Sequence, residues 1–231
     1  MSRQPSSFPP LFLRLPTVLL CLHILAFDLS NTEHCYDTGN FTAASGYSNS
    51  KNRELVLSSL PCAMASNGGF YTGNVGNGSD VVYMLSFCRG DSSNDTCIRC
   101  ISATAVDLII KCPNQKAAYS KGTYNLPCFI RYSDSPMYSM KKTFLTLKFY
   151  RTSDILMDQD QFDWIWRNLT EKLAARASMT LDLKFAAGST VLPNNQTMYS
   201  SLQCSPNLSQ GDCQSCLGNA LMIIKDVAME D

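Results

Sequence analysis

The cysteines are the residues of this chain whose chemistry is easiest to specify. The chain has 11 cysteines among 231 residues, and only 2 histidines. At this density, cysteines form disulfides in an oxidising compartment, whereas in a reducing one they bind metal or do catalysis. The spacing C-x8-C-x2-C occurs twice, at Cys88, Cys97 and Cys100 and again at Cys204, Cys213 and Cys216. An identical spacing at two places indicates a tandem duplication.

The N-terminus favours the oxidising compartment. A short basic segment containing Arg3 precedes an apolar run that is densest over residues 17–26. This order is typical of a secretory signal peptide, which we predict over residues 1–26, and the run is short for a membrane span. An uncleaved N-terminal anchor is the alternative. Cleavage would remove Cys21 and leave an even number of cysteines, as a disulfide framework requires.

Glycosylation motifs point to the same compartment. Six Asn-x-Ser/Thr triplets are potential acceptors, at Asn40, Asn77, Asn94, Asn168, Asn195 and Asn207. Each triplet is a weak signal alone, but together with a signal peptide they predict a secreted glycoprotein.

Zinc binding and catalysis are the competing interpretations of these residues. Both C-x2-C pairs have the local spacing of zinc ligands, but they lie far apart and in a chain with secretory signals. After signal cleavage His34 is the remaining histidine, and no Gly-x-Ser-x-Gly motif occurs. The carboxylates Asp158, Asp160 and Asp163 are interpreted as acids at a helix start. We therefore predict no metal, no cofactor and no enzymatic activity, and the zero net charge without a basic run predicts no nucleic-acid partner.

The elements that must position the cysteines can be placed from apolar periodicity and turn residues. In the first copy we predict helices over 52–65 and 96–111 and strands over 68–72, 81–87 and 124–132. In the second copy we predict a helix over 158–177, strands over 183–187 and 196–203, and a helix after Cys213. The counterpart of residues 111–132 is missing from the second copy, and the boundary between copies falls near residues 133–138.

Motifs around the cysteines carry a resemblance to a plant family. They are Cys88-Arg-Gly-Asp91, Cys112-Pro-Asn-Gln115 and Cys128-Phe-Ile-Arg-Tyr132. From residue 31 to residue 231 the chain resembles cysteine-rich repeat secretory proteins and the ectodomains of cysteine-rich receptor-like kinases. Their repeated unit is homologous to ginkbilobin, an antifungal seed protein. The resemblance implies two ginkbilobin-homologous domains, over 31–134 and 141–231, the second C-terminally incomplete. Each would be a disulfide-rich α+β unit with two helices on a five-stranded antiparallel sheet.

The resemblance also implies a disulfide pattern. Carried over residue by residue, the family's bridges are Cys35–Cys112, Cys88–Cys97, Cys100–Cys128 and Cys204–Cys213. Cys62 and Cys216 have no assigned partner. We expect Cys62 to be a free thiol, because a small buried residue suits its helix face. We expect Cys216 to lack its partner because the second copy is incomplete; a bridge between the two, or to another chain, stays open.

Carbohydrate binding is the functional candidate that the resemblance raises. In the ginkbilobin-type lectins of the family, mannose is held by an Asn, an Arg and a Glu, and here those positions are Tyr36, Gly122 and Ser133. All three are substituted, so mannose-dependent antifungal activity is disfavoured. Lys121 and Tyr124 are further polar side chains that a different sugar site would use, but the sequence does not show that they converge.

The sequence therefore predicts a secreted, apoplastic, non-enzymatic recognition protein of the cysteine-rich repeat family, with a role in stress or defence signalling as a family-level expectation. Its partner would be an extracellular ligand or protein, carbohydrate included, and no membrane span is predicted. The alternative is a truncated ectodomain of a membrane-bound cysteine-rich receptor-like kinase.

Overall fold

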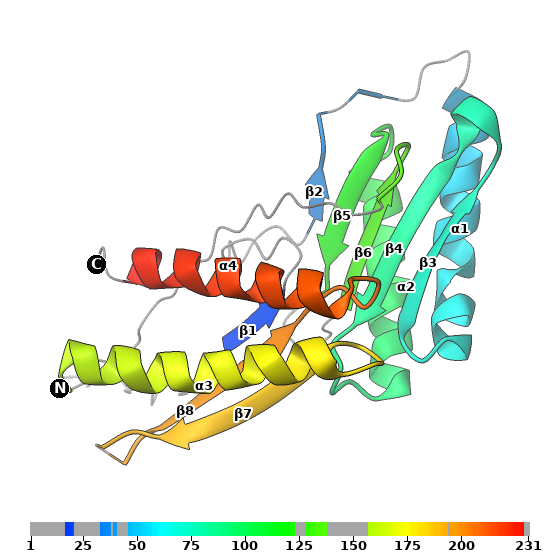
Figure 1. The fold of residues 1–231 in the computed structure, drawn as a ribbon. Helices are drawn as coiled ribbons and strands as arrows, with labels where there is room; N and C mark the ends of the chain where they lie inside the picture. Colours follow the sequence, from blue (N-terminus) through cyan, green and yellow to red (C-terminus); the bar gives the residue numbers. More distant parts are fainter. Residues whose placement is uncertain are drawn as a thin grey trace, which may run out of the picture.

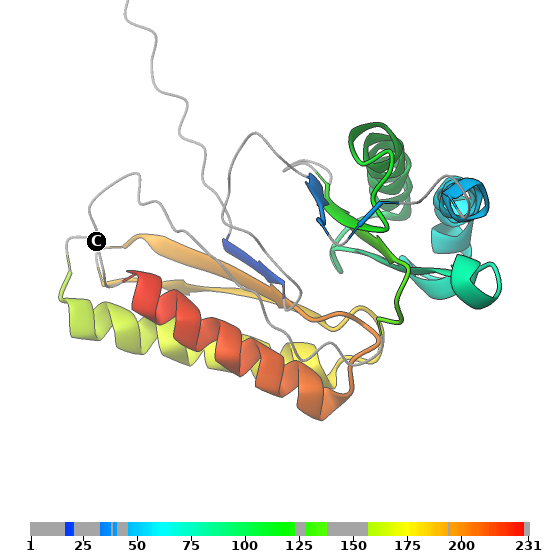
Figure 2. The ribbon, with the colours of Figure 1, turned by 90° about the horizontal axis from the view of Figure 1, so that it is seen from above.

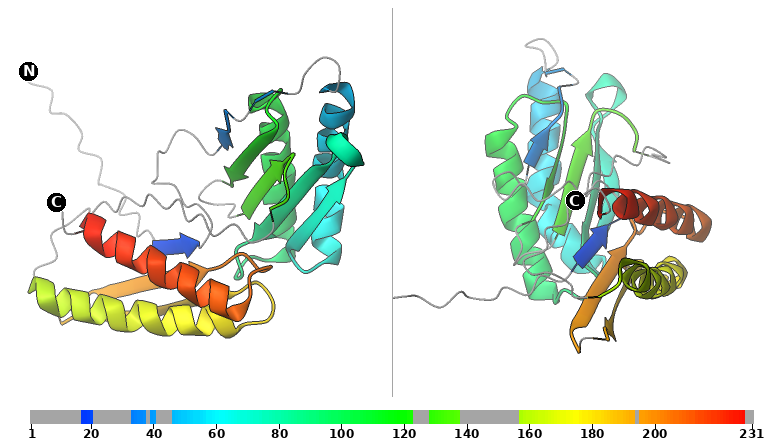
Figure 3. Two further views of the ribbon diagram at one scale, coloured as in Figure 1. Left: turned by 45° about the horizontal axis from the view of Figure 1, so that its top comes forward. Right: turned by 90° about the vertical axis from the view of Figure 1, so that its left-hand side faces the viewer.

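The computed structural model of the chain describes residues 17–20, 33–37, 39–40, 46–122, 128–137, 157–193 and 195–228. Two α+β units follow one another along the chain (Figure 1). The helices of the first unit run crosswise to those of the second (Figure 3).

The first unit packs two helices against one face of a sheet. The helices are α1 (Gly46–Ser66) and α2 (Asn94–Lys111). The strands are β2 (Glu33–Cys35), β3 (Phe70–Val75), β4 (Val82–Cys88), β5 (Ala117–Lys121) and β6 (Cys128–Ser133), with a short 3-10 turn, η1 (Gly78–Asp80), between β3 and β4. They form a five-stranded sheet in the order β2-β5-β6-β4-β3, and every neighbouring pair is antiparallel. This is the α+β architecture that the resemblance implies for the first copy.

The core of this unit follows from the alternation of side chains along each strand. On β6, Ile130 and Tyr132 face the helices and are fully buried, together with Leu57 and Leu60 of α1 and Leu108 of α2. The alternate residues of β4, β5 and β6 point to the opposite face, where Phe87, Tyr119 and Phe129 form a separate cluster. The sheet therefore has two apolar faces, and the helices cover one of them (Figure 2).

The second unit has a smaller sheet. Helices α3 (Gln159–Met179) and α4 (Gln210–Ala228) lie on one face of β7 (Phe185–Val191) and β8 (Thr197–Gln203). Strand β1 (Thr17–Leu20) pairs in parallel with β8, at the edge where β6 lies against β4 in the first unit. It falls inside the segment predicted to be a signal peptide, and the cleavage of that segment stays a prediction.

Local geometry recurs between the two units. The amide of Cys88 donates to Gly69 at 2.9 Å, and the amide of Cys204 donates to Lys184 at 3.0 Å. Each following helix starts at a serine: Ser93 caps α2 by accepting from the amide of Thr96, and Ser209 accepts from the amide of Asp212 in the same way. The repeat read from cysteine spacing is therefore also a repeat of strand ends and helix caps.

The predicted elements differ from the observed ones in identifiable ways. Helix α1 begins at Gly46 rather than at residue 52, and it retains Pro61 inside it. Strand β5 is absent from the elements read from periodicity, and the strand predicted over 124–132 is observed from Cys128 to Ser133. Residues 124–127 of that prediction, Tyr124 included, lie outside the described residues.

The two units touch where β4 and β8 end. The buried amide of Gln203 donates through Nε2 to the carbonyl oxygens of Cys88 and Leu183, each at 3.0 Å. Gly90 faces Phe185 so closely that a Cβ built on it would lie 2.4 Å from the Cβ of Phe185. A glycine is needed here because any side chain would force the units apart.

Candidate functional site

Four disulfides hold the described elements together. They are Cys35–Cys112, Cys88–Cys97, Cys100–Cys128 and Cys204–Cys213, the same pairs that the family pattern implies. The first ties the edge strand β2 to the end of α2, and the third ties α2 to β6. Because each bridge restricts the unfolded chain, the framework stabilises units whose sheets are small.

The two cysteines left without an assigned partner behave differently from each other. Cys62 is a free thiol, as expected, but it is exposed, so its expected burial is wrong. The reason is helical geometry: Leu57, Leu60 and Met64 form the buried stripe of α1, and Cys62 lies off that stripe. Cys216 is disulfide-bonded, so the expectation that it lacks a partner is wrong.

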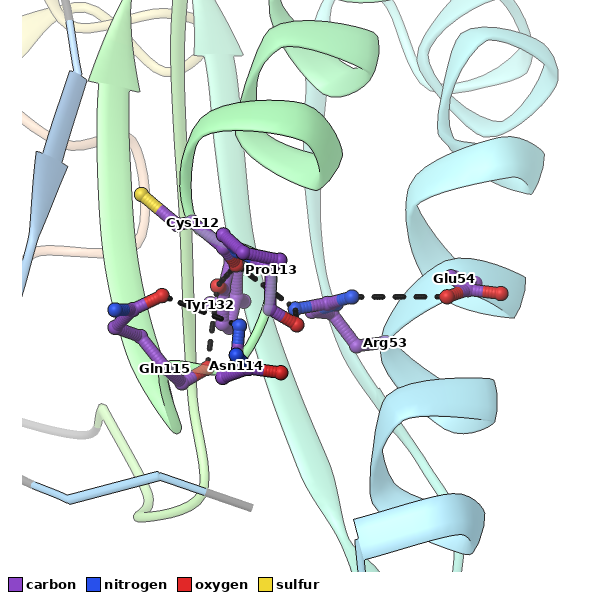
Figure 4. Close-up of polar contacts among 7 residues, drawn as sticks. All are labelled: Arg53, Glu54, Cys112, Pro113, Asn114, Gln115 and Tyr132. Atoms are coloured by element: carbon purple, nitrogen blue, oxygen red, sulfur yellow. Dashed lines mark hydrogen bonds and ion pairs between the residues drawn. The ribbon is translucent and has the colours of Figure 1, made fainter.

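A buried arginine fixes the turn between α2 and β5 (Figure 4). The Nη1 of Arg53 donates to the carbonyl oxygens of Cys112 and Pro113, at 2.9 and 2.7 Å. The hydroxyl of Tyr132 lies 3.3 Å from the same Cys112 oxygen and 3.2 Å from that of Gln115. Burial, the larger effect, raises the pKa of Tyr132, and the nearby Arg53 opposes it. This cluster satisfies carbonyl groups at a helix end, which is a structural role.

Of the three positions that hold mannose in the family's lectins, two lie close together in this structure and the third lies far from them. Tyr36 and Ser133 flank Ala117 in one row across the sheet, since the Tyr36 amide donates to Ala117 and Ala117 pairs with Ser133. Gly122 lies at the other end of the β5–β6 pair, where its amide donates to Cys128 at 2.7 Å. Five residues of strand, roughly 17 Å, separate it from that row. The three positions therefore do not converge.

A different group of side chains does converge, on the sheet face that the helices leave free. We call it the aromatic face, and it comprises His34, Tyr36, Phe87, Tyr119, Phe129 and Arg131. The ring centroids of His34 and Tyr119 lie 5.2 Å apart and those of His34 and Tyr36 4.8 Å apart. Tyr36 and His34 are among the candidates that the sequence indicates, whereas Tyr119 and Arg131 are not.

Register explains why these side chains meet. His34 pairs with Tyr119 across β2 and β5, and Tyr119 pairs with Arg131 across β5 and β6. Residues that pair directly across strands project on the same face, so the three form one row. The guanidinium of Arg131 lies 5.4 Å from the ring centroid of Tyr36, within the range of a cation–π interaction.

The electrostatics of the aromatic face are those of neutral phenols beside a cation. Burial raises the pKa of Tyr36 above its ordinary value, and the guanidinium of Arg131 partly opposes that shift. Burial also raises the pKa of Tyr119, to which the neighbouring Tyr36 adds. Both phenols are therefore protonated at neutral pH and retain hydroxyl groups that can donate a hydrogen bond.

The carboxylates that the sequence analysis considered have structural roles. Asp158 caps α3, since its Oδ1 accepts from the amide of Gln161 at 3.1 Å, and Asp163 accepts from the side chain of Gln159 at 3.2 Å. Within the described residues, no three His, Cys, Asp or Glu side chains gather as a metal site would require.

The predicted glycosylation acceptors lie mainly on the surface. Asn168 is half-buried in α3, whereas the other five are exposed: Asn40, Asn77, Asn94, Asn195 and Asn207. In the part of the chain that the structure describes, no helix is long and apolar enough to cross a membrane.

Comparisons with known proteins place this fold. The salt stress response/antifungal family model matches residues 34–135 and 151–229. The chain is 31% identical to the Arabidopsis thaliana cysteine-rich receptor-like protein kinase 14. The alignment covers 84% of this chain and 30% of the kinase. The chain is 32% identical to cysteine-rich receptor-like protein kinase 26 of the same species, over 91% of this chain and 32% of that one. The chain thus spans about a third of the length of these relatives.

Solved structures agree with the fold. The tandem DUF26 ectodomain of the Arabidopsis thaliana cysteine-rich receptor-like protein PDLP8 matches with a TM-score of 0.66 and 24% identity, over 84% of this chain and 86% of that one. The ectodomain of PDLP5 matches with a TM-score of 0.65 and 22% identity, over 84% and 87%. The family model matches both α+β units, and each unit contains disulfides, so the chain belongs to the salt stress response/antifungal (DUF26) family.

Proposed function

We propose that this protein is a secreted, non-enzymatic recognition protein of the apoplast that binds an extracellular ligand or protein. The observation that carries the proposal is the set of disulfides, of which three join described residues of the first unit and one joins described residues of the second. Such a framework is stable in oxidising compartments and rare in the cytosol. The homology to receptor-like kinase ectodomains supports the same side of the membrane.

The aromatic face of the first unit is the proposed recognition surface. It offers buried rings, an exposed histidine and a buried cation on a rigid, disulfide-anchored sheet. Binding sites of this kind combine apolar walls with a few placed polar groups. The substituted positions Tyr36, Gly122 and Ser133 argue against mannose as the ligand. A role in stress or defence signalling is part of the proposal at the level of the family.

The test is secretion of the full chain from plant cells. We expect the protein in the apoplastic wash, with a mass that falls after enzymatic removal of N-glycans. A variant with Leu19→Arg and Leu20→Arg, which interrupts the predicted signal sequence, is the matched control and should stay inside the cell. An unglycosylated wild-type chain retained in the cytosol would overturn the proposal.

A truncated receptor ectodomain is the second candidate. Its support is that this chain aligns with 30% of the length of a receptor-like kinase. The transcript beyond Asp231 distinguishes the two: an apolar run of about 20 residues followed by kinase motifs favours the receptor. A stop codon after a completed second cysteine motif favours the secretory protein.

A further inference from the structure

Arg131 is a buried cation without a counter-charge in the part of the chain that the structure describes. Its exposure is 6%, its Nε has no hydrogen-bond partner, and it takes part in none of the described ion pairs. An arginine side chain stays charged at any physiological pH. Leaving such a charge buried and unpaired costs several kcal/mol, so a complementary group is expected at this position.

The second buried arginine of this unit shows what a structural role looks like. Arg53 is 2% exposed, and its guanidinium donates to two carbonyl oxygens and lies 3.6 Å from Glu54. Among the described residues Arg131 has no such carbonyl or carboxylate partner, and its guanidinium makes a cation–π interaction with the ring of Tyr36. A cation–π interaction gives the N–H groups no oxygen acceptor, so the donors of Arg131 stay available to an oxygen ligand.

The nearby carboxylates are engaged elsewhere. Glu33 precedes His34 on β2, but its side chain points to the opposite face and lies 2.8 Å from Lys111. Asp134 follows β6 and lies 3.9 Å from Lys116. Neither of these two acids pairs with Arg131, so an anion from outside the chain has no internal competitor among them.

The rings around Arg131 define the shape of that anion. His34 on the edge strand β2 is exposed, and Tyr36, directly after that strand, is half-buried, so the aromatic face opens to solvent at that edge. Deeper in, Tyr119 and Phe129 stack with centroids 5.9 Å apart. A flat ligand with an apolar ring face can lie against the rings while its charged group reaches the guanidinium.

We propose that Arg131, with Tyr36 and His34, binds the carboxylate of an acidic sugar, that is, a ligand of the uronic acid class. A carboxylate matches the planar donors of a guanidinium in a bidentate pair, and the Tyr36 hydroxyl can donate to the same group. The C–H face of the sugar ring packs on the aromatic side chains. This inference rests on the proposed function, because it names the ligand class of that same face.

Galacturonate is the probe, and NMR is the readout. Titration into the full-length, disulfide-bonded protein should shift the Nε–H cross-peak of Arg131 saturably. Galactose, which lacks the carboxylate, and acetate, which lacks the ring, should each bind far more weakly. Arg131→Lys keeps the charge but loses the bidentate pair, so we expect about tenfold weaker binding. Arg99→Lys, at an exposed arginine of α2, is the matched control and should bind as the native chain does.

Three results would overturn the inference: no saturable shift with galacturonate, equal binding of acetate, or native affinity in Arg131→Lys. Tyr36→Phe keeps the ring and removes the hydroxyl, and it serves if Arg131→Lys does not fold; native affinity there would remove Tyr36 from the site. Secretion and glycosylation do not depend on the site. If the protein is secreted but does not bind galacturonate, the proposed ligand class is refuted. If the protein stays in the cytosol, the proposed function is refuted.

Discussion

Removal of the Cys35–Cys112 bridge should destabilise the first unit more than removal of Cys88–Cys97. The first bridge spans 77 residues and the second 9. The loop-entropy relation gives about 4.5 kcal/mol for the longer loop and about 2.7 kcal/mol for the shorter one. The difference of about 1.8 kcal/mol corresponds to roughly a 20-fold change in the unfolding equilibrium.

The structure explains why the longer bridge matters for the aromatic face. Strand β2 is an edge strand with three paired residues, Glu33 to Cys35, against β5. Without the bridge, β2 is held by this short ladder and by the ion pair between Glu33 and Lys111. His34 and Tyr36 should then lose their fixed positions beside Arg131, because they project from this strand.

The assay must separate the two units. Both tryptophans, Trp164 and Trp166, lie in α3, so tryptophan fluorescence reports the second unit. Hydrogen exchange of peptides from β4 and β6, measured by mass spectrometry, reports the first unit. The comparison is Cys35→Ala/Cys112→Ala against Cys88→Ala/Cys97→Ala. Equal losses, or a larger loss for the second variant, would refute the reasoning. Unchanged fluorescence-detected unfolding is the control.

Three further predictions concern single residues. Burial raises the pKa of Tyr132 above the ordinary 10.0, so the stabilising contribution of Tyr132 is complete below pH 10.0 and is lost as pH rises through its pKa in the folded protein. Alkaline unfolding followed by hydrogen exchange should show this loss of stability. An equal loss in Tyr132→Phe would contradict the prediction. Gly76 has φ +99°, and an added Cβ would meet the backbone oxygen of Asp80, so Gly76→Ala should cost about 1–3 kcal/mol in chemical denaturation. Gly78→Ala is the matched control, since Gly78 also has a positive φ but an added Cβ would meet no atom within 4 Å; a cost for Gly76→Ala no larger than for Gly78→Ala would contradict this. Arg53→Met leaves the Pro113 carbonyl oxygen without this donor and the Cys112 oxygen with the Tyr132 hydroxyl alone, so it should cost about 1–3 kcal/mol; protection of α2 equal to that of the native chain would contradict this.

Helices were predictable because their signals are local, and the four bridges because the family resemblance implies its pairing pattern for these cysteines. Helix α2 has its cap at Ser93 and its buried stripe at Ile101, Ala105 and Leu108, as the periodicity indicates. Strand β5 was not predictable in this way. Its sequence, Ala-Ala-Tyr-Ser-Lys, has one residue of high strand propensity, and it becomes a strand because it lies between β2 and β6.

The aromatic face was only partly predictable from the sequence. Alternation along β6 separates Ile130 and Tyr132 from Phe129 and Arg131, so a charged residue among strand-forming ones is a signal that the sequence contains. What the sequence does not contain is the register that brings Arg131 beside Tyr119 and His34, because that depends on pairing between distant strands. Cys62 is exposed although a small residue suits burial, because its position around the axis of α1, and not its chemistry, decides which way it faces.

Disulfide mapping tests the central claim most directly, that this is an extracellular protein built on a fixed disulfide framework. The secreted chain would be alkylated before digestion, and its peptides analysed by mass spectrometry without reduction. We expect Cys35–Cys112, Cys88–Cys97, Cys100–Cys128 and Cys204–Cys213 as linked peptides, with alkylation at Cys62. Alkylation of these eight cysteines in the native protein, or scrambled pairs among them, would contradict the account.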